Sequence, residues 1–244
     1  TIELIYNVDN AILITGFNGE IGRQTLLSLS KKEIPIIALD INESDIKYNN
    51  VIYIKDSILN QNVITSIFNN YNIIEVYHFA ALLSQSANND PELAHKVNEE
   101  GSKLIINFAM SHGIKNESFV KIFFPSSIAV YGPRKLKNAK EPDIIKPQTI
   151  YGCNKLAIEQ FGTQRHEESI ELGFGIDFRC LRFPGIISPY TIPFGGTTDF
   201  APQMLHAAYN NERYTCKVDS TTTLPFLGIK NAVEAIVQIM SIQN

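Results

Sequence analysis

Two side chains that can cooperate in proton transfer lie four residues apart in Tyr151-Gly-Cys-Asn-Lys155. At helical spacing this phenol and ammonium share one face. The nearby cation favours phenolate, which lowers a tyrosine pKa from about 10 toward neutral pH. Tyr151 is then a candidate general base for removing the proton of an alcohol. Upstream, the run Phe123-Phe-Pro-Ser126-Ser127 ends an apolar segment, so a serine hydroxyl can stand at the end of a strand. The spacing does not separate Ser126 from Ser127.

A glycine-rich segment, Gly16-Phe-Asn-Gly19-Glu-Ile-Gly22, joins an apolar run to a helical pattern. Glycines here permit a tight turn and let backbone N–H groups approach a pyrophosphate at the positive end of a helix. Asp40 ends the next apolar run, where its carboxylate can meet both hydroxyls of an adenosine ribose and repel a 2′-phosphate. The pattern predicts a dinucleotide site that favours NAD over NADP. Asp56, one strand later, either meets the adenine amino group or caps the following helix.

The elements that must position these residues alternate along the chain. Apolar runs predict strands at residues 11–15, 36–39, 51–54, 73–79, 119–124 and 176–183, and helical spacing predicts helices at 20–32, 58–71, 91–113, 151–168 and 231–242. We therefore expect an α/β fold, a doubly wound Rossmann sheet of parallel strands with its ligands at the carboxyl edge. A loop rich in Gly, Pro and Thr at 184–202 divides the chain into a dinucleotide-binding domain, residues 1–183, and a small substrate lobe, residues 184–244.

Composition excludes several classes of protein. With 44% hydrophobic and 19% charged residues the chain is globular, and its net charge of −4 argues against nucleic acid or an anionic membrane as partner. No apolar run approaches the roughly 20 residues of a membrane span. The three cysteines are far apart, which predicts free thiols in a reducing compartment, and no metal-site spacing is present. The expected location is a bacterial cytoplasm or a mitochondrial matrix.

The glycine loop, the serine pair and the Tyr151–Lys155 spacing resemble the extended short-chain dehydrogenase/reductase superfamily over almost the whole chain. Five segments are similar, more specifically, to L-threonine 3-dehydrogenases of the short-chain type: Ala80-Ala-Leu-Leu-Ser84, Pro125-Ser-Ser-Ile-Ala-Val-Tyr-Gly-Pro133, Arg182-Phe-Pro-Gly-Ile-Ile-Ser188, Gly195-Gly-Thr-Thr-Asp-Phe-Ala201 and Tyr214-Thr-Cys216. The resemblance implies a Rossmann fold, NAD as cofactor, a homodimer, and oxidation of the L-threonine β-hydroxyl to 2-amino-3-oxobutyrate.

The resemblance also implies roles for individual residues. Tyr151 would remove the hydroxyl proton, Ser127 would hydrogen-bond that oxygen, and Lys155 would hold the ribose and tune Tyr151. The residues implied at the cofactor are Gly16, Asn18, Gly19, Glu20, Ile21, Asp40, Asp56, Ser57, Phe79, Ala80, Ala81, Asn98, Tyr151, Lys155, Pro184 and Ile186. Those implied at the substrate are Ser84, Ser126, Ser127, Tyr151, Gly185, Thr197 and Thr198.

Alternatives remain at this stage. A nucleotide-sugar 4-epimerase or dehydratase uses the same scaffold, and an NAD-binding protein without turnover or an inactive fragment would share the glycine loop. Members of the resembled family continue beyond the position of Asn244, so we expect a truncated substrate lobe. Ser84 and the Thr197–Thr198 pair have a structural alternative as ordinary cap and loop groups. The cations Arg213, Lys217 and Lys230 stand near a Gly-Gly-Thr-Thr segment that suits a small zwitterion better than a nucleotide diphosphate.

Overall fold

A computed structural model describes residues 10–132, 145–190, 195–196 and 198–243 of the chain. Its main sheet has six parallel strands in the order β3-β2-β1-β4-β5-β6, which confirms the expected doubly wound α/β fold. The strands are β1 (Asn10–Thr15), β2 (Ile36–Asp40), β3 (Val51–Lys55), β4 (Asn72–His78), β5 (Phe119–Ser127) and β6 (Gly175–Phe183).

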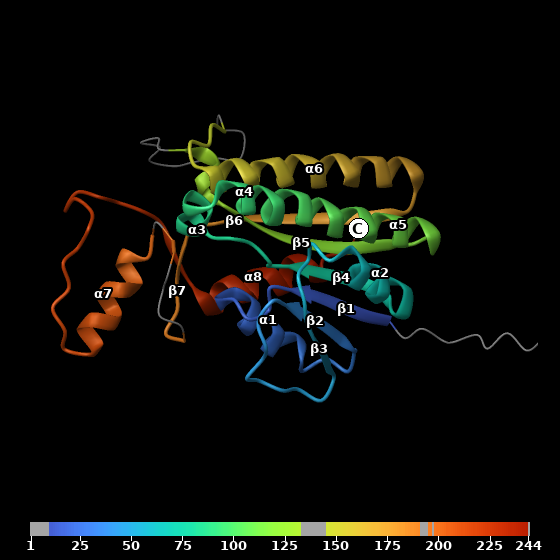
Figure 1. The fold of residues 1–244 in the computed structure, drawn as a ribbon, viewed down its shortest axis with the longest axis horizontal. Coiled ribbons are helices and arrows are strands. Elements are labelled where there is room, and N and C mark those ends of the chain that lie inside the picture. The colour runs from blue at the N-terminus through green and yellow to red at the C-terminus, as the bar shows by residue number, and fades with distance from the viewer. Residues whose placement is uncertain (1–9, 133–144, 191–194, 197, 244) are drawn as a thin grey trace, which may run out of the picture.

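Helices cover both faces of this sheet (Figure 1). One face carries α1 (Glu20–Leu29) and α8 (Ile229–Ser241), and the other carries α2 (Gln61–Asn70), α5 (Ser102–Lys115) and α6 (Ile150–Leu172). The two-residue period of β1 divides its side chains between two core clusters. Ala11 and Leu13 pack toward α2 and α5, whereas Ile12 and Ile14 pack toward α1 and α8. All four are at most 1% exposed, as expected for a strand buried on both faces.

Helix α8 packs on the sheet although the sequence assigns it to the second domain. Its Ala232, Ile236 and Met240 belong to the same core cluster as β1 and α1. At its C-terminal end, Arg179 donates to the carbonyl of Ile239, and Lys121 Nζ donates to the carbonyl of Met240 at 3.1 Å. These cations meet the carbonyls that a helix leaves unpaired at its negative end. The division at residue 183/184 stays a prediction, but the last helix is built into the sheet's own core.

The predicted helix at 91–113 is in fact several elements. They are α4 (Pro91–Ala94), a π-helix, η1 (His95–Gly101), and then α5, and a further short helix that the pattern does not predict, α3 (Ser84–Asn89), precedes them. Side-chain periodicity of 3.6 residues does not reveal a π-helix, which adds one residue to a turn and occurs often at functional sites.

Beyond the carboxyl edge lie four short elements that the pattern does not predict: the 3₁₀-helix η2 (Ile128–Tyr131), the parallel pair β7 (Gly185–Ile187) and β8 (Phe226–Gly228), and α7 (Phe200–Tyr209). Figure 1 shows α7 standing off the sheet beside β7. Within the part of the chain that the structure describes, no helix has the length and apolar character needed to cross a membrane.

Candidate active site

A cavity of about 720 Å³ opens at the carboxyl edge of the sheet. Residues that follow or end four strands line it, namely Gly16 after β1, Phe79 after β4, Ser127 on β5 and Pro184 after β6. Residues near the starts of α1, α3 and α6 also line it, among them Glu20, Ser84 and Tyr151. The sheet therefore brings together residues more than a hundred positions apart, at the edge where open α/β sheets bind ligands.

The glycine loop is shaped for close backbone contacts. Gly16 has a φ of +69°, and a Cβ there would lie 2.4 Å from the backbone nitrogen of Ala80. A Cβ on Gly22 would lie 2.4 Å from the carbonyl oxygen of Gly16. The N-cap of α1 is Gly19, which has no side chain to satisfy the first N–H groups of the helix, and this end of α1 lines the cavity through Glu20 and Ile21. This geometry suits a pyrophosphate.

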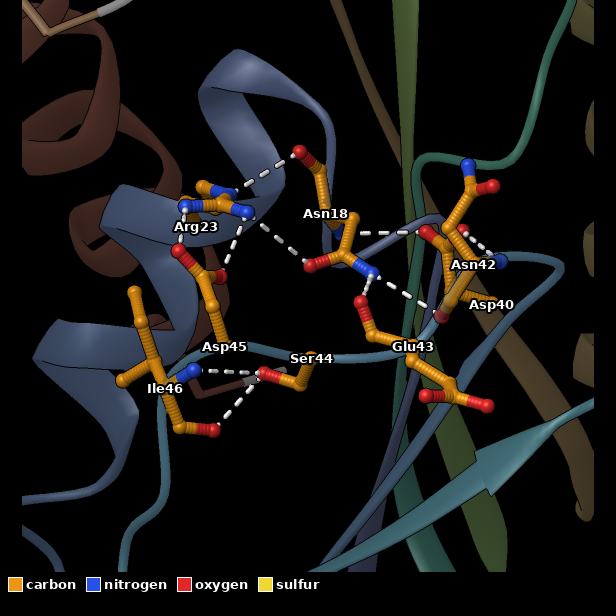
Figure 2. Close-up of polar contacts among 8 residues, drawn as sticks. All are labelled: Asn18, Arg23, Asp40, Asn42, Glu43, Ser44, Asp45 and Ile46. Atoms are coloured by element: carbon orange, nitrogen blue, oxygen red, sulfur yellow. Dashed lines mark hydrogen bonds and ion pairs between the residues drawn. The ribbon is translucent and has the colours of Figure 1, made fainter.

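Asp40 is tied to the glycine loop, as Figure 2 shows. Its carboxylate is 9% exposed and accepts hydrogen bonds from the N–H groups of Asn18 and Asn42, each at 3.0 Å. Because a carboxylate has about four acceptor positions, two remain for ribose hydroxyls. The amide of Asn18 donates to the carbonyls of Asn42 and Glu43, at 3.0 and 3.1 Å, and thus fixes the loop after β2 against the loop after β1.

Six of the residues predicted at the cofactor do not line the cavity, namely Asn18, Asp40, Asp56, Ser57, Ala80 and Asn98. Asp56 accepts from the N–H of Ser57 at 2.7 Å and from the amide of Asn60 at 3.1 Å. Asn98, in the π-helix and 3% exposed, accepts from the N–H of Leu82 at 2.7 Å and donates to its carbonyl at 3.0 Å. Asn98 thus fixes the chain that leaves β4. Direct contacts of these six residues with the cofactor stay a prediction.

The predicted serine, tyrosine and lysine meet at the cavity. Ser127 Oγ accepts from the N–H of Ala129 at 3.2 Å and caps η2. A Cβ on Gly152 would lie 2.6 Å from the carbonyl oxygen of Ala129, so the first turn of α6 rests directly on η2. This contact holds Tyr151 and Ser127 at one cavity. Ser126 also lines it; its hydroxyl is buried and has no partner in the described part of the chain.

Burial controls the charge of the pair on α6. Lys155 is 4% exposed, and its Nζ lies 5.5 Å from the ring centroid of Tyr151. Burial lowers the pKa of Lys155 to about 8, against the opposing influence of Cys180 and Glu159, and burial raises the pKa of Tyr151 to about 12. The direction for Tyr151 is opposite to the one expected from the Tyr–Lys spacing, because desolvation of the phenol is the dominant cause of its pKa shift.

The far end of the cavity carries the predicted substrate residues Ser84, Gly185 and Thr198, with Ile186 beside them. The N–H of Gln85 donates to the carbonyl of Gly195 at 2.8 Å, which joins α3 to the loop before α7. Thr197 lies outside the described residues. Ala81, which is predicted at the cofactor, lines the cavity.

Sequence reasoning missed Asp199, which lines the same end of the cavity. Its Oδ2 accepts from the N–H of Gly196 at 2.7 Å, and burial raises the pKa of this carboxyl above its usual value of 3.8. The residue follows Gly-Gly-Thr-Thr in a region expected to be loop. In the sequence, the only sign of a function for Asp199 is a carboxylate that directly follows two threonines. Tertiary contacts are what bring this carboxylate to the cavity.

Comparison with known proteins agrees with this geometry. Residues 12–243 match the NAD-dependent epimerase/dehydratase family. The chain is 34% identical over 234 residues to the mitochondrial L-threonine 3-dehydrogenase of Bos taurus, which covers 94% of this chain and 60% of that protein. It is 33% identical over 236 residues to an uncharacterized epimerase/dehydratase of Staphylococcus haemolyticus, with 94% and 70% covered.

Among solved structures, the L-threonine dehydrogenase from Cupriavidus necator, in its holo form, matches with a TM-score of 0.85 at 28% identity, over 96% of this chain and 73% of that one. The chain thus spans about 60% of the length of the curated dehydrogenase that it matches.

The residues present fit the cofactor of this family. Gly16 and Gly22 leave space for hydrogen alone, the uncapped start of α1 lines the cavity, and Ser126 offers a buried hydroxyl without a partner among the described residues. NAD is therefore the cofactor, with its pyrophosphate expected at the start of α1. The match over residues 12–243, together with the sheet order and this cradle, shows that the chain belongs to the NAD-dependent epimerase/dehydratase family.

Proposed function

We propose that this protein oxidises the β-hydroxyl of L-threonine to the ketone of 2-amino-3-oxobutyrate, in threonine catabolism. The relative from Bos taurus, an L-threonine 3-dehydrogenase, supports the substrate, and the meeting of Ser127, Tyr151 and Lys155 at one cavity supports the chemistry. The main observation in favour of this substrate is the charge of the residues that line the cavity. Among the described lining residues Lys155 is the only Lys or Arg, while Glu20, beside the glycine loop, and Asp199, next to Thr198, each contribute a carboxylate.

That wall favours a small amino acid over a nucleotide sugar. The substrate of an epimerase carries a diphosphate, which needs cations, and Arg213, Lys217 and Lys230 do not line the cavity. The ammonium of an amino acid instead needs a carboxylate. We assign Asp199 to that ammonium, and the hydroxyls of Ser84 and Thr198 to the head group as a whole.

The reaction removes a proton from the hydroxyl and a hydride from the same carbon. When bound, NAD supplies the hydride acceptor and a positively charged ring. Tyr151, as phenolate, takes the hydroxyl proton, and Ser127 donates a hydrogen bond to the oxygen. Burial raises the pKa of Tyr151 to about 12, so a nearby positive charge must lower this pKa before the phenolate can form near neutral pH. Lys155 provides part of that charge from the same face of α6.

NADH formation at 340 nm with L-threonine and NAD tests the proposal, with L-serine, L-allo-threonine and UDP-galactose as controls. We expect turnover with L-threonine, and its loss by about 10³-fold in Tyr151→Phe with NADH affinity retained. An epimerase re-oxidises its NADH in each cycle, so conversion of UDP-galactose to another sugar nucleotide without net NADH, and without oxidation of L-threonine, would replace the dehydrogenase by an epimerase. Near-normal turnover in Tyr151→Phe would remove Tyr151 as the base.

We also propose that two copies of the chain associate through α5 and α6. These helices expose apolar side chains, with Ile114 at 38%, Ile170 at 55% and Leu172 at 51%. Burying such residues against a second copy removes apolar surface from water. Light scattering after gel filtration should give twice 27.4 kDa. A mass of one chain at micromolar concentration would contradict the dimer. A bacterial cytoplasm or a mitochondrial matrix stays our prediction for the compartment.

A further inference from the structure

A paired cation stands close to the predicted ribose site. The guanidinium of Arg23, on α1, lies 2.7 Å from Asp45 Oδ1 through Nη2 and 3.4 Å from Asp45 Oδ2 through Nη1. The same side chain donates from Nε to the carbonyl of Asn18 at 3.2 Å and from Nη2 to Asn18 Oδ1 at 3.4 Å. Among the residues that the structure describes, Asn18 and Asp45 thus hold Arg23, and only Asp45 neutralises its charge (Figure 2).

This ion pair is connected to Asp40 through one residue. The N–H of Asn18 donates to Asp40 Oδ2 at 3.0 Å, so Arg23, Asn18 and Asp40 form a continuous hydrogen-bonded chain. Asp40 is the carboxylate predicted to meet the adenosine ribose. Arg23 therefore stands at the border of the place where a 2′-phosphate on that ribose would have to fit.

A 2′-phosphate carries close to two negative charges and is bound best by an arginine, whose planar fork can hold two phosphate oxygens. Arg23 is a group of this kind, yet its fork is directed at Asp45. Two neighbouring cations are also engaged: Lys55 Nζ, at the end of β3, pairs with Glu43 at 2.9 Å, and Lys47 Nζ, in the loop after β2, lies 4.5 Å from the ring centroid of Tyr53. We propose that Asp45, by occupying Arg23, is a second determinant of NAD over NADP, beside Asp40.

The geometry separates this role from a contribution to folding. The side chain of Asp45 is 69% exposed and that of Arg23 31%, and exposed ion pairs of this kind add little to stability. The two bonds from Arg23 to Asn18 do not involve Asp45. In Asp45→Asn the guanidinium should therefore stay beside the glycine loop with its charge uncompensated. The inference concerns the nucleotide end of the cleft and does not depend on which alcohol is oxidised.

Calorimetric titration of the chain with NADPH and with NADH tests the proposal without any turnover. In Asp45→Asn the dissociation constant for NADPH should fall about tenfold relative to that for NADH, the gain expected for one charge-assisted contact. Glu43→Gln is the matched control, because it removes another carboxylate of the same loop and changes net charge equally. It should shift the ratio much less.

The double variant Arg23→Gln, Asp45→Asn tests whether Arg23 is the group that gains the phosphate contact. This variant should lose the tighter NADPH binding expected of Asp45→Asn. An unchanged NADPH-to-NADH ratio in Asp45→Asn would overturn the proposal, as would an equal shift in Glu43→Gln or a gain that survives in the double variant. Parallel weakening of both nucleotides would also overturn it, since Asp45 would then act only by holding the loop. Thermal unfolding of each variant checks that the fold is retained.

Discussion

The ammonium of Lys155 lies 4.4 Å from the ring centroid of Phe124, a β5 residue that is only 3% exposed. A positive charge on the face of an aromatic ring regains part of the interaction that it loses by leaving water. The compensation is incomplete here, because burial still lowers the pKa of Lys155 from 10.5 to about 8. Keeping Lys155 charged in its buried position therefore lowers the stability of the folded chain, although the residue is assigned to catalysis.

That cost predicts a pH dependence of stability. Between pH 8 and 10.5 the unfolded chain binds the Lys155 proton and the folded chain does not, so the free energy of unfolding rises with pH across this window. Below pH 8 the full cost, roughly 3 kcal/mol, is present. Lys155→Met should thus stabilise the ligand-free chain at pH 7 by roughly 1–3 kcal/mol while abolishing turnover.

Urea unfolding of the ligand-free chain at pH 7 and at pH 9.5 measures this effect. The free energy of unfolding of Lys155→Met should exceed that of the native chain by less at pH 9.5 than at pH 7. The comparison stops below pH 10 because the raised pKa of Tyr151 adds an opposite slope above that point. An advantage of equal size at both pH values would show that packing, and not charge, separates the two proteins.

His78 predicts a second window, on the acid side. Its Nδ1 lies 2.6 Å from Thr15 Oγ1 and its Nε2 2.9 Å from Ser102 Oγ, so the ring joins β1, β4 and α5. Burial, with a smaller effect of Lys155, lowers the pKa of His78 from 6.5 to about 3. The stability linked to the neutral ring is complete above pH 6.5 and is lost as the pH falls toward 3.

His78→Gln should be less stable at pH 7 but should lose less stability on acidification. Between pH 6.5 and 4.5 the native chain should lose about 2–3 kcal/mol that the variant keeps. Urea unfolding at several pH values in this range measures both slopes. Identical slopes would mean that another group takes up the proton.

Gly16 and Gly173 offer a matched comparison of two left-handed glycines. Gly173 ends α6 with a φ of +82° and has nothing within 4 Å of an added Cβ, so Gly173→Ala should cost only backbone strain, about 1 kcal/mol. Gly16→Ala adds a clash with the backbone of Ala80 and must displace the chain after β4. NADH affinity should fall about tenfold or more in Gly16→Ala and stay unchanged in Gly173→Ala, measured by calorimetry. Equal affinities would remove the glycine loop from the cofactor site.

The sequence predicts the parts of this molecule that rest on local patterns. Gly16 through Gly22, Asp40 and the Tyr151–Lys155 pair are recognisable because turn, strand end and helix spacing depend on neighbouring residues only. The parallel sheet follows from the alternation of those elements.

The features that escaped prediction depend on contacts between distant segments. Asn98 sits in a π-helix and bonds to Leu82, a contact that no periodicity encodes. The raised pKa of Tyr151 reflects its burial in the folded chain, whereas the four-residue spacing shows only the nearby ammonium. Asp199 reaches the cavity because Gly195 is bonded to Gln85, more than a hundred residues earlier.

Asp199 also gives the sharpest test of the substrate assignment. Asp199→Asn keeps an oxygen that can accept from the N–H of Gly196, so the loop should hold its shape while the charge is lost. The KM for L-threonine should rise about tenfold, since a charge-assisted bond to the ammonium becomes a neutral one, and NADH affinity should not change. Asp219→Asn, which alters an exposed carboxylate bonded within its own turn, is the control.

The pH profile distinguishes this role from a merely structural one. Because burial raises the pKa of Asp199, the carboxylate takes up a proton as the solution becomes acidic, and the KM of the native chain should increase as the pH falls toward that pKa. Asp199→Asn has no such group, so its KM should stay flat over the same range. If the KM of Asp199→Asn equals that of the native chain at pH 8, or if both rise together in acid, the ammonium of threonine is bound elsewhere in the cavity.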